Sequence, residues 1–257
     1  MSALITIMAI IAASFGFKYS NNNEVKNERK SIGAFEPVAV IELFTSQGCS
    51  SCPSADKLLG NTIHNNIGKK VFALSYHVDY WNRLGWADPF SSAAFSNRQN
   101  QYVRALNIDG AYTPQIVVNG NREFVGSDKN ALLSSLGNAL SQKAEAGFSE
   151  LEALQYQQKA IKVKYKLEGN YVNTSINFAL ISISETTEIK RGENGGITLT
   201  NENIVRQLVT QKADVKGEIV FAISPMPQAK NAAVIVFIQK QNSLQIIGAA
   251  MTKIQNF

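Results

Sequence analysis

Two cysteines carry the most distinctive chemistry of this 257-residue chain, and they are its only cysteines. They form the motif Cys49-Ser50-Ser51-Cys52-Pro53. If a helix begins here, both sulfurs lie in its first turn, close enough to form and break a disulfide without rebuilding the backbone. Unpaired N–H groups at a helix N-terminus also stabilise a thiolate. We therefore predict thiol–disulfide exchange, with Cys49 as nucleophile and Cys52 as resolving residue.

A second candidate element is Thr113-Pro114, which directly precedes a predicted strand. Bonds from any residue to proline are the only peptide bonds that readily become cis. A cis proline opposite the cysteines would leave neighbouring backbone groups free to bind a substrate strand, whereas a trans proline would simply open the strand. The upstream cysteine pair favours the cis form. It makes Pro114 a catalytic candidate, and Thr113 and Tyr112 substrate-binding candidates.

The segment after residue 76 supplies a histidine and several aromatic side chains. His77 could join Cys49 and Cys52 as a ligand of Cu(I) or zinc, although a structural or site-lining role is the preferred interpretation. Trp81 and Trp86 stand in an aromatic loop, residues 77–90, that is either a substrate-binding lid or a cluster anchoring the loop. There is no histidine after His77, which excludes a histidine-based catalytic site in the C-terminal half.

The elements that must position these residues are predicted from hydrophobic periodicity. Residues 38–44 are an apolar run typical of a covered central strand. Further strands are predicted at 70–76, 115–118 and 122–125, and helices at 54–67, 91–106 and 128–145. The resulting order over residues 37–147 is β-α-β-α-β-β-α, with the first two strands parallel.

After residue 147 the pattern changes to short alternating segments separated by turn signals. Strands are predicted at residues 161–167, 172–183, 219–223, 233–238 and 244–251. This spacing predicts an all-β immunoglobulin-like sandwich domain over residues 148–257.

The first 36 residues precede the predicted fold. Residues 1–20 contain an apolar run too short for a membrane-spanning helix, and they predict a signal peptide or an N-terminal anchor. Residues 21–36 are predicted to be a flexible tether. The chain is therefore expected to be exported to the periplasm or the outside of the cell, and to contact a membrane only through an uncleaved N-terminal segment.

Composition excludes several classes of protein. The hydrophobic fraction is 45% and the charged fraction 18%, which excludes a disordered chain. The net charge of +5 comes without a Lys/Arg-rich run, so no nucleic-acid partner is expected. Two cysteines exclude a multi-disulfide scaffold and a four-cysteine zinc site.

Residues 38–146 resemble the thioredoxin superfamily in their cysteine motif, in Thr113-Pro114 and in the closing helix. More closely, the motifs ELFTSQGCSSCP (42–53), HVDYW (77–81), YTPQ (112–115), KRGENGG (190–196) and NIVRQL (203–208) resemble a secreted thioredoxin-like family known as domain of unknown function 1223. The resemblance implies an α/β thioredoxin-like domain with a redox site, without naming a substrate. It also implies a buried acid that moves a proton at the resolving cysteine. Glu42 is the candidate for that acid, with a strand-surface carboxylate as the alternative. Ser50-Ser51 replaces the Gly-Pro of ordinary thioredoxins, and no tryptophan precedes Cys49.

The sequence thus predicts an exported thiol–disulfide oxidoreductase without a cofactor. Its partners would be protein thiols or disulfides, and an envelope partner could bind the β-domain. Two alternatives stay open. One is a copper-handling protein that uses Cys49, Cys52 and His77, and the other is a non-catalytic binding module with a structural disulfide.

Overall fold

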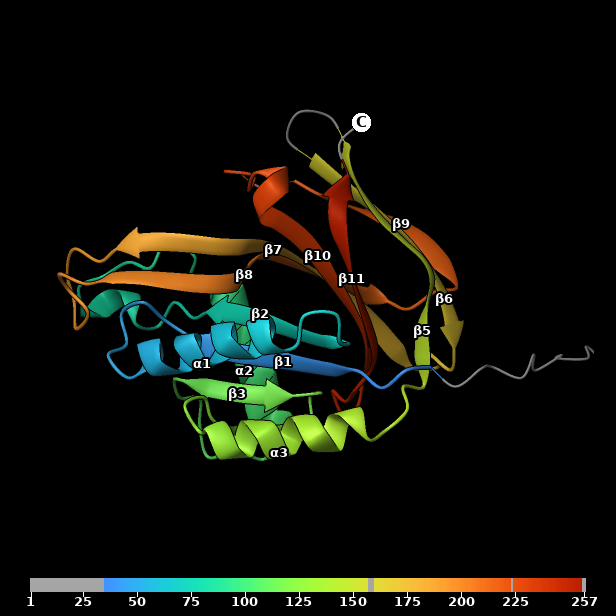
Figure 1. The fold of residues 1–257 in the computed structure, drawn as a ribbon, viewed down its shortest axis with the longest axis horizontal. Coiled ribbons are helices and arrows are strands. Elements are labelled where there is room, and N and C mark those ends of the chain that lie inside the picture. The colour runs from blue at the N-terminus through green and yellow to red at the C-terminus, as the bar shows by residue number, and fades with distance from the viewer. Residues whose placement is uncertain (1–34, 157–159, 223, 256–257) are drawn as a thin grey trace, which may run out of the picture. The chain divides into compact units, whose positions relative to one another are not determined.

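The computed structural model describes residues 35–156, 160–222 and 224–255, and these described residues belong to one compact unit. The described residues contain three α-helices and eleven strands (Figure 1). The helices are α1 (Cys52–Asn65), α2 (Ala93–Ala105) and α3 (Lys129–Leu140). The strands are β1 (Ala39–Thr45), β2 (Val71–His77), β3 (Gln115–Val118), β4 (Arg122–Val125), β5 (Ala146–Tyr156), β6 (Ala160–Gly169), β7 (Thr174–Glu188), β8 (Thr198–Lys212), β9 (Lys216–Phe221), β10 (Ala232–Lys240) and β11 (Ile246–Gln255).

The fold class predicted from the sequence is wrong. Instead of an α/β thioredoxin-like domain followed by an immunoglobulin-like sandwich, the described strands form one mixed sheet in the order β4-β3-β1-β2-β8-β7-β10-β11-β5-β6-β9. The helices and strands of the first half lie close to the predicted positions. The assembly differs because β2 pairs in parallel with β8, at Ser75 and Ile204, and so joins the two halves. The boundary expected at residue 147 stays a prediction.

Three apolar cores hold the sheet together. The first lies between β1, β3, α1 and α3, where Ile41, Leu43 and Leu59 are buried. The second contains α2 together with residues of β1, β2, β7, β8, β10 and β11. The third lies among β5, β6, β7, β9, β10 and β11. Because successive residues of a strand point to opposite faces, alternate residues of β1 enter the first and the second core. This accounts for the continuous apolar run of that strand.

Strand β8 brings the C-terminal half to the cysteines. In Figure 1 the hairpin of β7 and β8 runs beside β2 and α1, and α1 contacts β8 directly. The connection between these two strands, residues 189–197, reaches the loop that precedes α1. The site at the start of α1 is therefore built from both halves of the chain.

The predicted signal peptide or anchor, residues 1–20, lies outside the described residues, as does the tether, residues 21–36, apart from Phe35 and Glu36. Among the described helices, none combines the length and the apolar character needed to cross a bilayer.

Candidate functional site

The cysteine motif forms a disulfide at the beginning of α1, so the disulfide predicted between Cys49 and Cys52 is confirmed. Their Cα atoms are 5.4 Å apart. The helix begins at Cys52 and continues with Pro53, whose missing N–H costs nothing in a first turn. Ser50 and Ser51 are exposed, while both cysteines have no exposed surface. The disulfide therefore lies beneath its own loop in a closed site.

Thr113 and Trp81 cover the sulfur of Cys49. The Thr113 hydroxyl donates to Cys49 Sγ over 3.3 Å and accepts a hydrogen bond from Trp81 Nε1 over 2.8 Å. The Thr113–Pro114 peptide bond is cis, and Pro114 is buried where β3 begins. The structure thus brings together Cys49, Cys52, Thr113, Pro114 and Trp81.

The connection between β7 and β8 holds the backbone of the cysteine loop from the other side. The buried Asn194 amide donates to the carbonyls of Gln47 and Cys49, each over 2.9 Å. Glu193 Oε2 accepts a hydrogen bond from the Ser50 N–H over 2.9 Å. The Ser50 hydroxyl and N–H together lower the pKa of this exposed carboxyl. The segment 189–197 therefore fixes the loop in its closed position.

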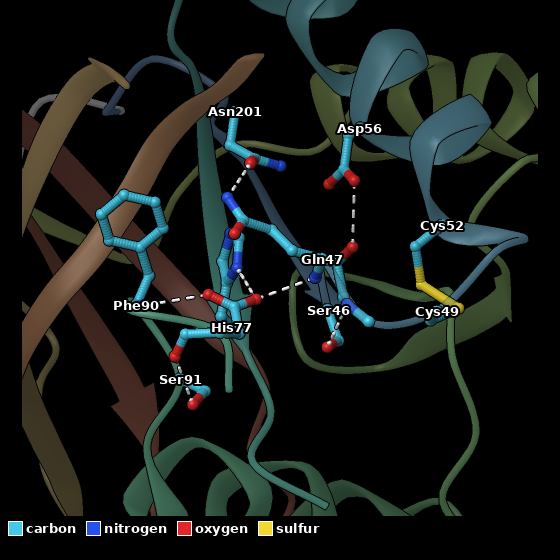
Figure 2. A network of polar contacts seen from close by, with 12 residues as sticks. Ser46, Gln47, Cys49, Cys52, Asp56, His77, Phe90, Ser91 and Asn201 are labelled. Atoms are coloured by element: carbon cyan, nitrogen blue, oxygen red, sulfur yellow. Dashed lines mark hydrogen bonds and ion pairs between the residues drawn. A yellow bond between two sulfur atoms is a disulfide. The ribbon is translucent and has the colours of Figure 1, made fainter. Parts of the chain in front are cut away.

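Gln47 connects this loop with the aromatic segment and with β8. Its side-chain oxygen accepts from Trp86 Nε1 over 3.2 Å, and its amide donates to Asn201 Oδ1 over 3.0 Å (Figure 2). The Gln47 N–H donates to Asp88 Oδ2 over 2.8 Å. Trp86 is thus placed against the cysteine loop through Gln47, whereas Trp81 reaches Cys49 through Thr113.

His77 forms a buried pair with Asp88, with 2.7 Å between Nδ1 and Oδ2. Burial opposes the charged imidazolium, but the Asp88 carboxylate outweighs burial and raises the pKa of His77. Burial also disfavours the charge of Asp88. The His77 imidazolium and the N–H groups of Gln47 and Phe90 overcome that effect and lower the pKa of Asp88.

The metal-binding alternative gains no support from this geometry. In residues 35–156, 160–222 and 224–255, no group of three or more His, Cys, Asp or Glu side chains is arranged to hold a metal ion. His77 uses Nδ1 for Asp88, and its Nε2 has no hydrogen-bond partner among the described residues. A ligand set of Cys49, Cys52 and His77 is therefore not assembled.

Asp56 is a buried acid on the helix that carries Cys52. Its Oδ2 accepts a hydrogen bond from the Thr45 hydroxyl over 3.2 Å, whereas its Oδ1 has no partner in the described part of the chain. Figure 2 shows the Asn201 amide turned toward this carboxylate. Burial raises the pKa of Asp56 to about 6, although the charge of His77 opposes the rise. Asp56 can therefore exchange a proton near neutral pH.

Glu42 and Tyr112 have their principal contacts away from the disulfide. Glu42 lies on β1 and is buried with Arg98, whose Nε and Nη2 donate to its two oxygens over 2.5 and 2.9 Å. The hydroxyl of Tyr112 donates to Glu123 Oε2 over 2.7 Å, on β4. Their predicted roles in proton transfer and substrate binding stay predictions.

Several residues that build the site were not predicted from the sequence, notably Gln47, Asp56, Asn194 and Asn201. The sequence does indicate that Asp56 is buried, because it lies four residues after Cys52 and three before Leu59, on the buried face of an amphipathic helix. A carboxyl group on such a face is costly unless it is paired or used. Asn194 and Asn201 carried no comparable signal, since only the tertiary fold brings them to the cysteines.

A family model described as "Protein of unknown function (DUF1223)" matches residues 40–239. The chain belongs to this family. The match confirms the resemblance to domain of unknown function 1223, but not its thioredoxin-like or secreted character, and it spans both halves of the sheet. No curated protein matches this DUF1223 chain.

Solved structures support a shared fold. The crystal structure of protein AGR_C_4864 from Agrobacterium tumefaciens is 30% identical, with a TM-score of 0.65. The match covers 86% of the DUF1223 chain and 96% of the Agrobacterium chain. A domain of the outer membrane lipoprotein Omp28 from Porphyromonas gingivalis is 17% identical over 44% of this chain and 90% of that domain. Its TM-score of 0.28 is too low to support an argument.

Proposed function

We propose that this DUF1223 protein is a thiol–disulfide oxidoreductase whose redox pair is Cys49 and Cys52. The observation that carries the proposal is the Cys49–Cys52 disulfide at the N-terminus of α1, with the Thr113 hydroxyl 3.3 Å from Cys49 Sγ. A helix N-terminus stabilises a thiolate, and a hydroxyl beside the sulfur can donate a hydrogen bond to it.

Cys49 is the better candidate for the sulfur that exchanges with a substrate. It precedes the helix, and its Sγ has two hydroxyl neighbours, Thr113 and Ser51, each 3.3 Å away. Cys52 belongs to the first turn of α1 and lies beneath the loop. A substrate thiolate that attacks Cys49 would form a mixed disulfide and release Cys52, and the second substrate thiol would then displace Cys49 and leave with the disulfide. The reverse sequence would reduce a substrate disulfide and oxidise Cys49 and Cys52. Protein thiols or disulfides are the proposed partners.

Export is part of the same proposal. The N-terminal apolar run is typical of a signal peptide, and a disulfide persists in oxidising compartments outside the cytosol. The sequence and the disulfide together therefore support a periplasmic or extracellular location.

A second candidate function is a binding module in which the disulfide is only structural. The observation in its favour is the burial of both cysteines, which have no exposed surface. Exchange would require the cover formed by Trp81, Thr113 and the segment 189–197 to open, because a thiolate must reach a sulfur along the axis of the disulfide.

Equilibration of the purified protein in glutathione and dithiothreitol redox buffers, followed by thiol trapping and mass spectrometry, separates the two candidates. We expect one reversible two-electron transition within the range of known oxidoreductases. Cys52→Ser should accumulate a mixed disulfide at Cys49 with a substrate disulfide, because no resolving cysteine is present, and Cys49→Ser should abolish turnover. A disulfide that stays oxidised in excess dithiothreitol, in a folded protein, would contradict the redox function and support the structural one.

A further inference from the structure

A cavity of about 290 Å³ lies between α1 and β8, next to the disulfide. Pro53, which follows Cys52, forms part of its wall, and so do Asp56 and Asn201. Lys57, Asn61, Thr198 and Thr200 also line it, and these four residues are exposed. The cavity is therefore open to solvent and has the buried residue Asp56 in its wall.

Thr45 binds one oxygen of Asp56, and the Asn201 amide faces the carboxyl group. The Thr45 hydroxyl donates to Oδ2, whereas Oδ1 has no partner within hydrogen-bond distance among the described residues. The Asn201 amide lowers the pKa of Asp56 less than Thr45 does. The charges of His77, at the end of β2, and of Asp88, in the loop that follows, act on Asp56. Glu202 on β8 and Lys57 on α1 lie in the wall of the same cavity. No salt bridge within 4.0 Å ties the carboxylate of Asp56 in the described part of the chain, whereas Glu202 is paired with His64 at 2.9 Å.

We propose that Asp56 carries the proton to and from Cys52, and that the cavity between α1 and β8 connects Asp56 with solvent. Residues four apart on a helix are neighbours on one face, which places the carboxyl group of Asp56 one turn from Cys52. The cavity is large enough for water, since a water molecule occupies about 30 Å³ in the liquid. This inference rests on the proposed redox function.

A dithiol reductant would reduce the Cys49–Cys52 disulfide in two displacement steps. One reductant thiolate attacks Cys49 Sγ, the Cys49–Cys52 bond breaks, and Cys52 leaves with the electron pair. Cys52 takes the proton of the Asp56 carboxylic acid, which becomes a carboxylate and regains a proton from solvent through the cavity. The second reductant thiol then attacks the reductant sulfur of the mixed disulfide and releases Cys49 as a thiolate, while its own proton goes to Cys49 or to solvent. The reductant is oxidised to a disulfide, and the protein is reduced by two electrons.

The acidity of Asp56 suits this role. Burial raises its pKa to about 6, so both protonation states are populated near neutral pH. The carboxylate of Glu42, by contrast, is bound by Arg98 and Tyr102 from α2. His77 is bound to Asp88.

Rates of disulfide reduction by dithiothreitol between pH 5 and 9 test the proposal, after correction for the reductant thiolate concentration. For wild type we expect the corrected rate to fall as pH rises through about 6, because the acid form of Asp56 is lost. Asp56→Asn should be about tenfold slower at pH 5 and lack this dependence. Asp109→Asn, at an exposed acid outside the wall of this cavity, is the control and should keep the wild-type profile. An Asp56→Asn protein with the wild-type profile would overturn the proposal.

If Asp56→Asn does not fold, a measurement on the wild-type protein tests the proposal instead. The carboxyl carbon of Asp56 is titrated by NMR in the oxidised and the reduced protein. We expect its midpoint to change when the disulfide is reduced, because a thiol or thiolate then replaces the disulfide at Cys52, and an unchanged midpoint would overturn the inference. If wild type itself does not react with dithiothreitol, the proposed function fails. If wild type reacts and Asp56 is without effect, only the role of Asp56 fails.

Discussion

At the scale of single residues, the site contains acids whose charge is controlled by burial. Asp56 and Asp88 are both buried near His77, but their surroundings differ. Asp88 accepts hydrogen bonds from two N–H groups and faces the His77 ring, so its ionised form is stabilised. For Asp56, burial outweighs the opposing effects of the His77 charge, the Thr45 hydroxyl and the Asn201 amide, and it favours the protonated form. The same side-chain type therefore serves as a fixed charge at one position and as a proton carrier at the other.

The pH dependence of stability should reveal the raised pKa of Asp56. The pKa is about 6 in the folded protein against 3.8 for the ordinary group, so the folded state binds the proton more tightly. Stability therefore falls as pH rises from about 4 to about 6, and the loss is complete above that range. Asp56→Asn removes the buried charge and should stabilise the protein at pH 8 by about 1–3 kcal/mol, with little gain at pH 4.

Urea unfolding at the two pH values measures this difference. His77 also loses stabilising charge as pH rises, because its pKa is raised, and the Asp56 charge contributes to that rise, so the measured difference includes the interaction of this pair. Asp109→Asn, at an exposed acid, is the matched control and should change stability little at either pH. Equal effects of Asp56→Asn at pH 4 and pH 8 would contradict the raised pKa.

At the scale of secondary structure, the connection between β7 and β8 controls access to the disulfide. Asn194→Ala removes the two hydrogen bonds to the carbonyls of Gln47 and Cys49. Each such bond contributes about 1 kcal/mol, so opening of the cysteine loop should become easier. We expect disulfide reduction by dithiothreitol to accelerate by roughly 5–30-fold, measured by thiol trapping at pH 7.

Asn231→Ala is the control for this variant. Asn231 also bonds with two backbone groups, the N–H and the carbonyl of Ser184 on β7, rather than with the backbone of the cysteine loop. It should leave the rate unchanged. If Asn194→Ala reacts no faster than Asn231→Ala, the segment 189–197 does not limit access.

The elements themselves were predictable to different degrees. Helices α1 and α2 and strands β1 to β4 follow from apolar periodicity and turn residues, because their patterns are local. Strand β8 was not predicted. Its first half contains Asn201, Glu202 and Asn203, and Asn203 has a positive φ of 48°, which interrupts the alternation of a regular strand. The missing strand explains the wrong fold class, since β8 is the element through which β2 and β7 enter one sheet.

The residues of the candidate site were likewise predictable only where a local sequence motif contains them. Cys49, Cys52, Thr113 and Trp81 could be proposed from motif and spacing, and the structure places them together. Asn194 and Asn201 reach the cysteine loop only through the hairpin of β7 and β8, more than a hundred residues away in sequence. No local pattern reports such a contact.

At the scale of the whole molecule, a buried ionic network joins β1, α2 and β10. Arg98 binds both oxygens of Glu42, and Tyr102 donates to the same carboxylate. Gln239 of β10 donates to the Tyr102 hydroxyl over 2.9 Å. The guanidinium of Arg98 also lies 5.1 Å from the ring centre of Phe237. The network therefore lies where the helix-covered part of the sheet meets the C-terminal strands.

This arrangement predicts that Glu42 acts on stability rather than on exchange. Glu42→Gln leaves the buried Arg98 guanidinium without its carboxylate and should cost about 3–5 kcal/mol in urea unfolding. The double variant Glu42→Leu/Arg98→Met removes both charges and should be more stable than Glu42→Gln, because no unpaired charge stays buried. At low urea, where Glu42→Gln is folded, its disulfide should react with dithiothreitol at the wild-type rate and with the wild-type pH profile. A flattened pH profile with unchanged stability would instead assign the proton transfer to Glu42 and remove it from Asp56.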